Sequence, residues 1–357
     1  FFPDHHMTTK KSTKFSFKTK VLLSFAVLVL CILAGTGINF YLKYFRSNVT
    51  GNTDYLYIKT GSTFEDVYST LKSEKMLNDP KSFLYAAENM EYKSKIKPGR
   101  YRLEKGMGNR ALINMLKAGN QEPVKIAFQN VRLKHTLAGM VSKKLETDSA
   151  SISALLDSAE FVQKYGFNTE NVFTMFIPNS YELYWNSSAE KFFERMHAEY
   201  LKFWTEERKV KAAKINLSQA EVSILASIVD GEALNDNEMP RIAGLYMNRL
   251  NKGMKLEADP TVIFANNDFT IRRVLNKHLR INSPYNTYLN KGLPPGPISM
   301  PSMNAIDAVL NFEKHNYIYM CAKEDFSGYH NYASTLSEHL VNARKFQQAL
   351  NERNIKK

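Results

Sequence analysis

Cysteine is scarce in this 357-residue chain, and its scarcity excludes a disulfide-stapled fold. The two cysteines are Cys31, inside a long apolar run, and Cys321, near the C-terminus. These two residues cannot sensibly pair, so the chain has no disulfide framework and must rely on hydrophobic cores for stability. Its length allows two or three domains, and its apolar fraction is ample for such cores.

Acidic residues are also in deficit. The chain has 35 acidic against 48 basic residues, and in its first 46 residues seven basic residues stand against Asp4 alone. The rest of the chain is moderately basic, which suits an anionic envelope polymer or a membrane surface. We expect no nucleic-acid partner, because no basic helix interleaved with aromatic residues is present.

Metal-binding patterns are missing as well. His330, His339 and Cys321 form no recognised ligand spacing, and H-E-x-x-H does not occur. The sequence shows no low-complexity tract and no solenoid period. We therefore expect no metal and no cofactor, and we interpret His330 as a cleft or packing residue.

An uncharged run from Val21 to Leu42 is the first feature that predicts a location. It holds 22 residues, against the ~20 that a helix needs to cross a bilayer. Five lysines precede the run, and only Lys43 and Arg46 follow it closely. This asymmetry predicts a single-pass helix, with residues 1–20 in the cytoplasm and the rest of the chain outside the cell membrane.

A cleavable signal peptide is the alternative interpretation of this run. Residues 34–37 are small and could form a cleavage site, but the run is long for a signal sequence. Cys31 is preceded by Leu30, which argues against lipoprotein processing. Residues 1–6 precede Met7 and are set aside from the reasoning on fold.

Residues 52–124 predict a small α+β module, reached through a short polar linker at 47–54. Two strand–turn–helix units are expected in it. One starts with the strand Tyr55–Lys59, and the other starts with the strand Gly99–Leu103 and closes with a helix that Gly119 ends.

A buried helix that carries an acid is expected in the second half of the chain. Its apolar positions recur at helical spacing: Val222, Leu225, Ala226, Val229 and Ala233. Glu232 lies at the rim of this apolar face. A carboxyl group held against apolar side chains has a raised pKa, which keeps it protonated and ready to act as a general acid. A partly buried glutamate paired with an arginine is the alternative.

The loop Ser283–Pro301 is rich in proline and glycine, so it is expected to be rigid. It also carries Tyr285, Asn286, Thr287 and Tyr288. Aromatic and amide groups of this kind stack on sugar rings and bind their hydroxyl and acetamide groups. The loop therefore predicts sugar contact.

Other acidic residues have structural explanations. Asp259 precedes Pro260, a pattern typical of an N-cap followed by proline at the first helical position. Glu338 completes an S/T-x-x-E capping box with Thr335. Asp230 lies two residues before Glu232, on a different face of the helix, so these two carboxyl groups should not form a dyad.

Four sequence blocks, present in order, resemble the endolytic murein transglycosylase family, the membrane-anchored enzymes of the YceG-like group. The blocks are Leu225–Glu232, Asn248–Val262, Tyr285–Pro301 and Gly328–His339. One departure lies in the helix, where the family usually has Val-Glu-Lys-Glu and this chain has Val229–Glu232 as Val-Asp-Gly-Glu. The second acid is kept, and the glycine lowers helix propensity by ~1 kcal/mol relative to alanine.

The resemblance implies an α+β architecture and a location. A single transmembrane helix at 21–42 in the inner membrane would be followed by a LysM-like module at 52–124. A mainly helical catalytic domain with a short β element would occupy 125–352 on the periplasmic side. The implied partners are peptidoglycan glycan strands, together with peptidoglycan synthases beside which nascent strands are terminated. A non-catalytic wall-binding or divisome scaffold is the alternative function.

The resemblance also implies a mechanism and site residues. Ordinary glycosidases need two carboxyl groups, whereas a lytic transglycosylase needs one. Glu232 would protonate the oxygen between N-acetylmuramic acid and N-acetylglucosamine, then take the proton of the muramic C6 hydroxyl, which leaves a 1,6-anhydro end. Asn286 and Tyr288 are the first candidates for substrate binding, followed by Tyr285 and His330.

Overall fold

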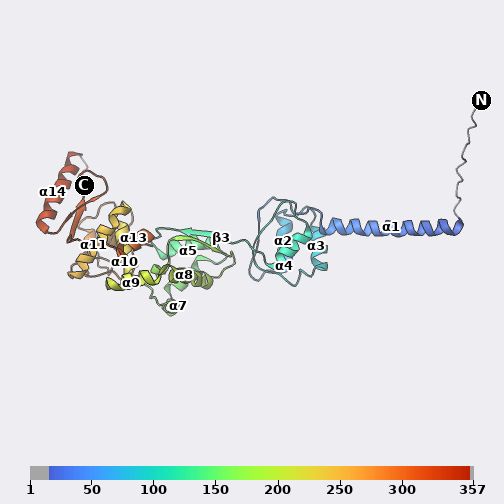
Figure 1. The fold of residues 1–357 in the computed structure, drawn as a ribbon, viewed down its shortest axis with the longest axis horizontal. Coiled ribbons are helices and arrows are strands. Elements are labelled where there is room, and N and C mark those ends of the chain that lie inside the picture. Colours follow the sequence, from blue (N-terminus) through green and yellow to red (C-terminus); the bar gives the residue numbers. More distant parts are fainter. Residues whose placement is uncertain (1–15, 354–357) are drawn as a thin grey trace, which may run out of the picture. The chain divides into compact units, whose positions relative to one another are not determined.

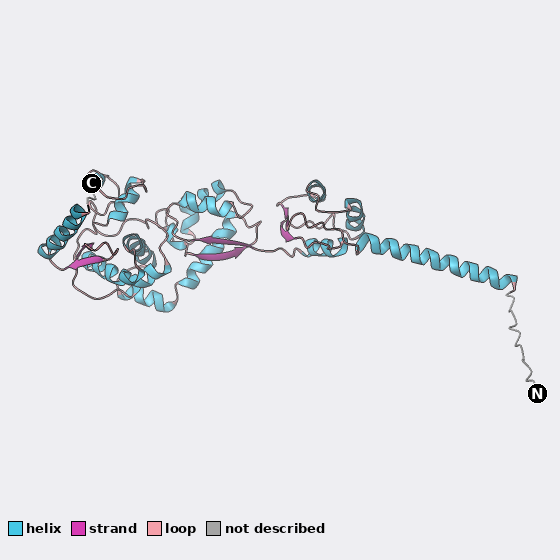
Figure 2. Cartoon of the chain, turned by 90° about the horizontal axis from the view of Figure 1, so that it is seen from above, coloured by secondary structure: helices cyan, strands magenta, loops and turns pink. Residues whose placement is uncertain are grey.

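A computed structural model describes residues 16–353 of the chain. Most of the predicted cytoplasmic tail, together with residues 1–6, therefore lies outside the described residues. The structure mixes helices and short strands and is mostly helical (Figure 2). It divides into two compact units, with the boundary between Glu122 and Pro123, and each is described by itself.

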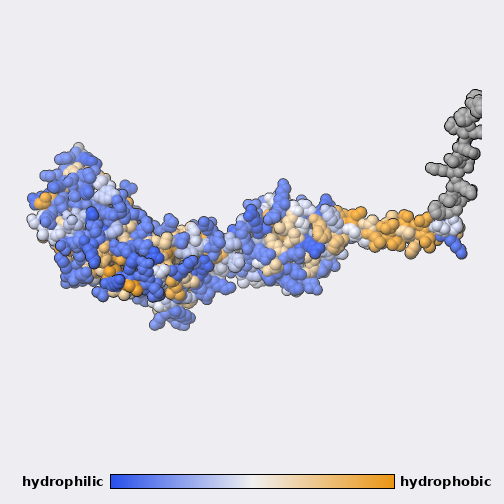
Figure 3. Space-filling model, in the orientation of Figure 1, coloured by the Kyte–Doolittle hydropathy of each residue, from blue (hydrophilic) through white to orange (hydrophobic). Residues whose placement is uncertain are grey.

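The first unit begins with α1 (Phe17–Tyr44), an apolar helix of 28 residues that extends the uncharged run by a few residues at each end. Apolar residues follow the helix along its length, and none of its side chains is buried (Figure 3). Among residues 16–353, it is the one helix long and apolar enough to cross a membrane, a test that a signal sequence also passes. This property fits a single-pass anchor.

The rest of the first unit is a small α+β module. Its elements are β1 (Tyr55–Ile58), α2 (Phe64–Ser73), α3 (Pro80–Asn89), β2 (Gly99–Arg102) and α4 (Asn109–Ala118). Strands β1 and β2 pair antiparallel, with Leu56 opposite Tyr101. Thr63 and Asp66 form a capping box at the start of α2, and Gly119 ends α4 in the left-handed conformation.

The start of the segment 47–54 differs from the polar linker that its composition predicts. Asn48 and Val49 are 3% and 1% exposed. Val49 forms a β-bridge with Leu77, and the Asn48 amide donates to Asn109 Oδ1 at 2.7 Å. Asn48 and Val49 are therefore part of the module core, while residues 51, 52 and 54 of the same segment are exposed.

The second unit begins with a two-stranded sheet covered by helices. The elements are β3 (Val124–Phe128), α5 (Lys134–Ser142), α6 (Ser149–Asp157), α7 (Ala159–Gln163), η1 (Val172–Met175), β4 (Asn179–Leu183), α8 (Ala189–Phe203) and α9 (Glu206–Lys214). Strand β4 begins at Asn179, directly after Pro178. This strand pairs antiparallel with β3, placing Tyr181 opposite Ile126.

The remaining elements surround α10 (Gln219–Glu232). They are η2 (Asp236–Glu238), α11 (Met239–Asn251), α12 (Asp259–Asn266), η3 (His278–Arg280), α13 (Met303–Leu310), β5 (Tyr319–Ala322), β6 (His330–Ala333) and α14 (Leu336–Glu352). Helix α10 packs against α11, α12 and α13, while α14 lies on the antiparallel pair β5–β6 (Figure 1). The predicted capping box of Thr335 and Glu338 starts α14.

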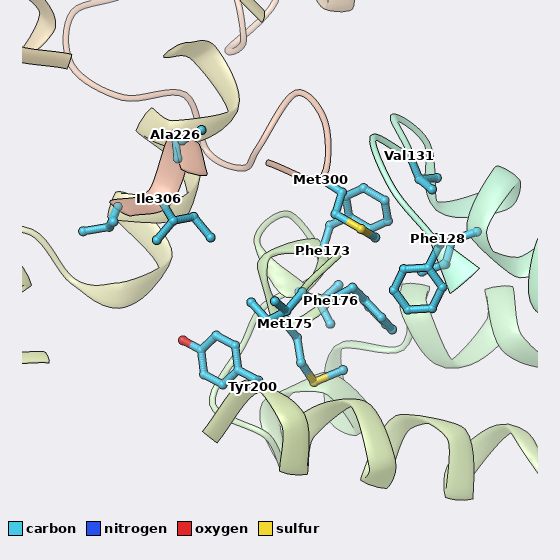
Figure 4. Packing of buried hydrophobic residues seen from close by; sticks show 14 of the residues in the cluster. Phe128, Val131, Phe173, Met175, Phe176, Tyr200, Ala226, Met300 and Ile306 are labelled. Carbon is cyan, nitrogen blue, oxygen red and sulfur yellow. The ribbon is translucent and has the colours of Figure 1, made fainter. Parts of the chain in front are cut away.

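A continuous core holds α10 in place. Residues Val222 to Val229 are all buried, and a capping box of Ser218 and Glu221 fixes the start of the helix. Figure 4 shows Ala226 of α10 beside Ile306 of α13, with Phe173, Met300 and Phe128 in the same cluster. The C-terminal end of α10 is therefore positioned by packing on several sides.

Candidate active site

A pocket of about 470 Å³ lies at the C-terminal end of α10. It is formed by residues from α10, α11, the start of α12, the proline-rich loop, the β5–β6 pair and α14. The polar side chains that line it include Glu232, Tyr246, Asp259, Tyr288 and His330. This pocket therefore combines the predicted acid with two of the predicted substrate-binding residues.

Glu232 is the last residue of α10, and two donors hold its carboxyl group. The Tyr246 hydroxyl of α11 donates to Glu232 Oε1 at 3.0 Å, and the backbone N–H of Asp259 also donates to this carboxyl group. The helix remains regular through Gly231. A Cβ atom at position 231 would lie 3.0 Å from Pro260 Cβ, so the glycine lets α12 approach α10 closely.

The electrostatic surroundings of Glu232 favour its protonated form. Burial raises the pKa of Glu232 to about 7, and the nearby negative charge of Asp259 adds to the rise. The hydrogen bonds from Tyr246 and from the Asp259 backbone act in the opposite direction. A carboxyl group with a pKa near neutrality can both donate and accept a proton at physiological pH.

Asp259 is not the N-cap that the Asp-Pro pattern predicts, so that prediction is wrong. The N-cap of α12 is Ala258, and no side chain caps this helix. Asp259 Oδ1 instead accepts a hydrogen bond from the Tyr288 hydroxyl at 2.7 Å, and burial raises the pKa of Asp259. The Asp259 side chain is free to enter the pocket because the helix starts one residue earlier than the pattern indicates, which makes Asp259 its first helical residue.

The predicted loop residues separate into two groups. Tyr288 lines the pocket. Asn286 is fully buried, and its amide donates to the carbonyl oxygens of Leu279 and Ile281, both at 2.9 Å, while its Oδ1 accepts from the Tyr288 backbone N–H at 3.0 Å. These bonds use the amide inside the loop, so Asn286 positions Tyr288 and does not itself face the pocket.

Tyr285 also lies outside the residues that line this pocket. Its ring packs against Phe264, with the ring centroids 4.8 Å apart. Thr287 is buried as well, and its hydroxyl group lies 2.8 Å from that of Thr261. Three of the four loop residues predicted to contact sugar therefore pack the loop against α12 or within itself.

His330 also lines the pocket, at the start of β6. Its Nδ1 lies 2.9 Å from Glu238 Oε2, and its backbone N–H donates to Glu238 Oε1 at 2.8 Å. Glu238 is 5% exposed, so this pair fixes the orientation of the imidazole ring. The other ring nitrogen takes no part in these bonds to Glu238.

Asp230 and Glu232 do not form a dyad, in agreement with their predicted placement on different faces. Asp230 accepts hydrogen bonds from the Ser302 hydroxyl at 2.8 Å and from the Ser302 backbone N–H at 3.2 Å. It therefore fastens the start of α13 to α10. Arg249 contacts Glu257 and backbone carbonyls, and these bonds do not involve Glu232.

Sequence reasoning missed Tyr246 and misjudged Asp259. Tyr246 lies on α11 at a position that helical periodicity assigns to the core, and it is indeed 1% exposed. Its hydroxyl group reaches Glu232 only because α11 packs against α10. In the part of the chain that the structure describes, no group of three or more His, Cys, Asp or Glu side chains could hold a metal ion.

Comparison with known proteins identifies the chain's family. The family model of the YceG-like family matches residues 56–345, which is most of the chain. The chain belongs to the YceG-like family. A crystal structure of a yceG-like protein from Listeria monocytogenes has a TM-score of 0.54 and 26% sequence identity, over 80% of this chain and 97% of that protein.

Curated relatives of this YceG-like chain carry a functional name. An endolytic murein transglycosylase of Bacillus subtilis (strain 168) is 30% identical over 317 residues, which cover 83% of this chain and 85% of that protein. An endolytic murein transglycosylase of Streptococcus pneumoniae (strain D39) is 26% identical over 296 residues. That match covers 74% of this chain and 53% of the streptococcal protein, so the chain spans about half of it.

Proposed function

We propose that this YceG-like protein is a peptidoglycan lyase, an endolytic lytic transglycosylase. It cleaves the β-1,4 bond between N-acetylmuramic acid and N-acetylglucosamine and leaves 1,6-anhydro ends. The observation that carries the proposal is Glu232, a carboxyl group with a pKa of about 7 at the end of a buried helix and in a pocket. The names of the curated relatives support the same reaction class.

In the proposed reaction, Glu232 acts first as an acid and then as a base. Its proton passes to the glycosidic oxygen as the bond from that oxygen to muramic C1 breaks. The muramic C6 oxygen then bonds to C1, and the C6 hydroxyl proton returns to Glu232, so the enzyme ends in its starting state. A pKa near 7 suits both steps, because neither protonation state is strongly disfavoured.

Asp259 and Tyr246 set the proton affinity of Glu232 in this proposal. The charge of Asp259 holds the proton on Glu232 before bond cleavage, and the Tyr246 hydroxyl stabilises the carboxylate that forms when the proton leaves. Tyr288 and His330, which both line the pocket, contact the glycan. Asn286 and Tyr285 act one step away, by holding the loop that presents Tyr288.

A glycan hydrolase is a second candidate, and Asp259 is the observation that favours it. Ordinary glycosidases use two carboxyl groups, and Asp259 is a second carboxyl group in the same pocket. Its Oδ1 accepts a hydrogen bond from Tyr288, however, and its backbone rather than its side chain contacts Glu232. These contacts support a role in which Asp259 raises the pKa of Glu232 and does not itself react. The chemical nature of the product ends distinguishes the two reactions.

The remaining parts of the chain are assigned by the same proposal. Residues 21–42 form a single-pass anchor in the inner membrane with a cytoplasmic N-terminus, supported by the apolar helix α1. Residues 52–124 act as a LysM-like module, and residues 125–352 form the catalytic domain outside the membrane. Acting beside peptidoglycan synthases, the enzyme terminates nascent glycan strands.

Mass spectrometry of digested glycans tests the reaction. The full chain in detergent is the appropriate sample, because Asn48 and Val49 belong to the module core and a truncation at Asn52 would remove them. Internal cuts with 1,6-anhydromuramic ends, absent from Glu232→Gln, are expected. Products with reducing ends would show that the protein is a hydrolase. If the unchanged chain binds glycan without cleaving it, the protein is a wall-binding scaffold.

A further inference from the structure

A cavity in the first unit lies where α1 meets the module. Its volume is about 800 Å³, and it is bounded by the last turns of α1, residues 46–48 and the start of α3. Its charged lining residues are Lys43, Arg46, Asp79 and Lys81. This cavity belongs to a different unit from Glu232 and takes no part in the proposed cleavage.

The walls of this cavity are fixed relative to each other by buried polar contacts. The Asn109 amide donates to the carbonyl oxygen of Lys43 at 2.8 Å, and the Asn48 amide donates to that of Asp79 at 3.0 Å. A Cβ atom at Gly108 would lie 2.8 Å from the carbonyl oxygen of Phe45, so the module backbone touches the helix end. The shape of the cavity is therefore determined by packing and hydrogen bonds within the first unit.

The cavity carries an excess of positive charge. Within residues 16–353, Lys43, Arg46 and Lys81 form no ion pair with a carboxylate. Lys43 Nζ lies 3.4 Å above the centre of the Tyr85 ring. The Asp79 carboxylate accepts from the backbone N–H groups of Lys81 and Ser82, both at 3.1 Å, so it caps α3 and offers little compensation.

Helix α1, which forms one wall of the cavity, indicates how deep the cavity would lie in a membrane. Asn39, Leu42 and Lys43 recur at helical spacing on α1 and line the cavity, and Arg46 lines it two residues beyond the end of the helix. The same helix face continues toward the N-terminus as Gly35, Ile32 and Leu28, which are apolar and unburied. A hydrocarbon core of ~30 Å needs ~20 helical residues, so the uncharged run fills it and the cavity lies at its edge.

Aromatic residues mark the same level. Phe40 and Tyr41 on α1 and Tyr85 on α3 are 51%, 59% and 42% exposed, where exposed aromatic side chains would be costly in water. Aromatic side chains collect at the boundary between the acyl chains and the headgroups. The cavity therefore lies where phosphate groups of lipids are concentrated, with cations above it and an apolar helix face below.

We propose that this cavity binds the headgroup of an anionic phospholipid. The headgroup phosphate contacts Arg46 and Lys81, and the acyl chains lie along the face of α1 that carries Ile32 and Leu28. Such a lipid fixes the tilt of the module on the membrane surface. The inference rests on the proposed membrane anchorage and is independent of the proposed cleavage chemistry.

Native mass spectrometry of the full chain, purified from membranes into detergent, tests the site. Phosphatidylglycerol, phosphatidylcholine and inorganic phosphate are titrated separately. The test variant is Arg46→Gln with Lys81→Gln. The control variant, Lys59→Gln with Lys72→Gln, removes the same charge from exposed positions of the same unit that do not line the cavity. Thermal unfolding establishes that both variants are folded.

We expect one phosphatidylglycerol per chain, bound at least roughly tenfold more tightly than phosphatidylcholine. Binding weakens about 10- to 30-fold in the test variant and is unchanged in the control. Equal losses in the two variants would reveal diffuse attraction and overturn the site. Equal affinity for phosphatidylcholine, or displacement of the lipid by millimolar inorganic phosphate, would overturn the anionic-lipid assignment.

The same spectra separate this inference from the proposed function. The intact mass shows whether α1 is retained, and a chain cut near residues 34–37 would overturn both the anchor and the lipid site. An intact chain that binds no lipid would overturn the lipid site alone. Glycan cleavage, measured on the same sample, reports on Glu232 regardless of either result.

Discussion

The active-site pocket and the cavity at the end of α1 differ in how their charged groups are surrounded. In the second unit, Glu232 contacts Tyr246 of α11 and the backbone of Asp259 at the start of α12. Burial raises the pKa of Glu232 to about 7, so the charged form of its carboxyl group is disfavoured. In the first unit, Lys81 and Arg46 are exposed and form no ion pair with a carboxylate among residues 16–353. A group that must exchange protons is desolvated, whereas groups that attract an anion are left hydrated until the anion arrives.

Among the substitutions that test this comparison, the largest expected effect on glycan cleavage comes from replacing Glu232. Glu232→Gln removes the exchangeable proton while preserving an acceptor for Tyr246, so glycan cleavage should fall by ~10²–10⁴-fold. Quantifying anhydro ends by mass spectrometry measures the loss. Glu313→Gln, an exposed acid outside the pocket, should cleave normally. Retained cleavage in Glu232→Gln would remove Glu232 from the mechanism.

The same substitution should stabilise the fold at alkaline pH. Because the pKa of Glu232 is about 7 when folded and near 4.5 when unfolded, the unfolded chain releases its proton more readily. Stability therefore falls as pH rises from 4.5 to 7. Glutamine escapes this loss, so Glu232→Gln should gain roughly 2–3 kcal/mol relative to the unchanged chain between pH 5 and pH 8. Denaturant unfolding of both chains at both pH values measures this gain, and a stability difference between the chains that is the same at pH 5 and pH 8 would contradict it.

A smaller effect is expected from the polar contacts that hold α1 to the module. Asn109 is 1% exposed and bonds Lys43, Asn48 and Ser82. Asn109→Ala leaves these partners unsatisfied and should cost about 1–3 kcal/mol in the free energy of unfolding of the first unit. Hydrogen exchange of the module measures the cost. Asn89→Ala, on the exposed end of α3, is the control and should cost less.

The finest comparison uses two neighbours that shift the pKa of Glu232 in opposite directions. Asp259→Asn removes a negative charge, which lowers the pKa and moves the alkaline limb of the cleavage profile to lower pH. Tyr246→Phe removes a hydrogen bond to the carboxylate, which raises the pKa and moves this limb to higher pH. Each shift should change the rate near pH 7 by up to about tenfold. Limbs that move in the same direction would refute the assigned roles.

What the sequence predicts well is local. The apolar spacing around Leu225 and Val229 places a buried helix and puts Glu232 at its rim, and the structure has both features. Helical periodicity and capping patterns depend on residues a few positions apart, so they can be identified from one chain.

What the sequence predicts poorly depends on distant partners. Asn48 is predicted to lie in a linker because its hydrogen-bond partner, Asn109, is 61 residues away in the sequence. Asp259 is predicted to be a helix N-cap because its hydrogen-bond partner, Tyr288, is 29 residues away in the sequence. The amide of Asn286 looks available for sugar, yet its carbonyl acceptors are supplied by the fold of the loop itself. In each case a polar side chain is assigned correctly only when the residue it bonds is known.

The close contact between Gly231 and Pro260 makes these two positions share one volume. A side chain at position 231 and the proline ring compete for the same space, since a Cβ atom would lie 3.0 Å from the ring. A lysine there, as in the family pattern, requires α12 to shift by a few tenths of an ångström, and the backbone N–H that holds Glu232 shifts with it. A library randomised at both positions should therefore recover active variants as matched large–small pairs, and the tolerance of one site would depend on the occupant of the other.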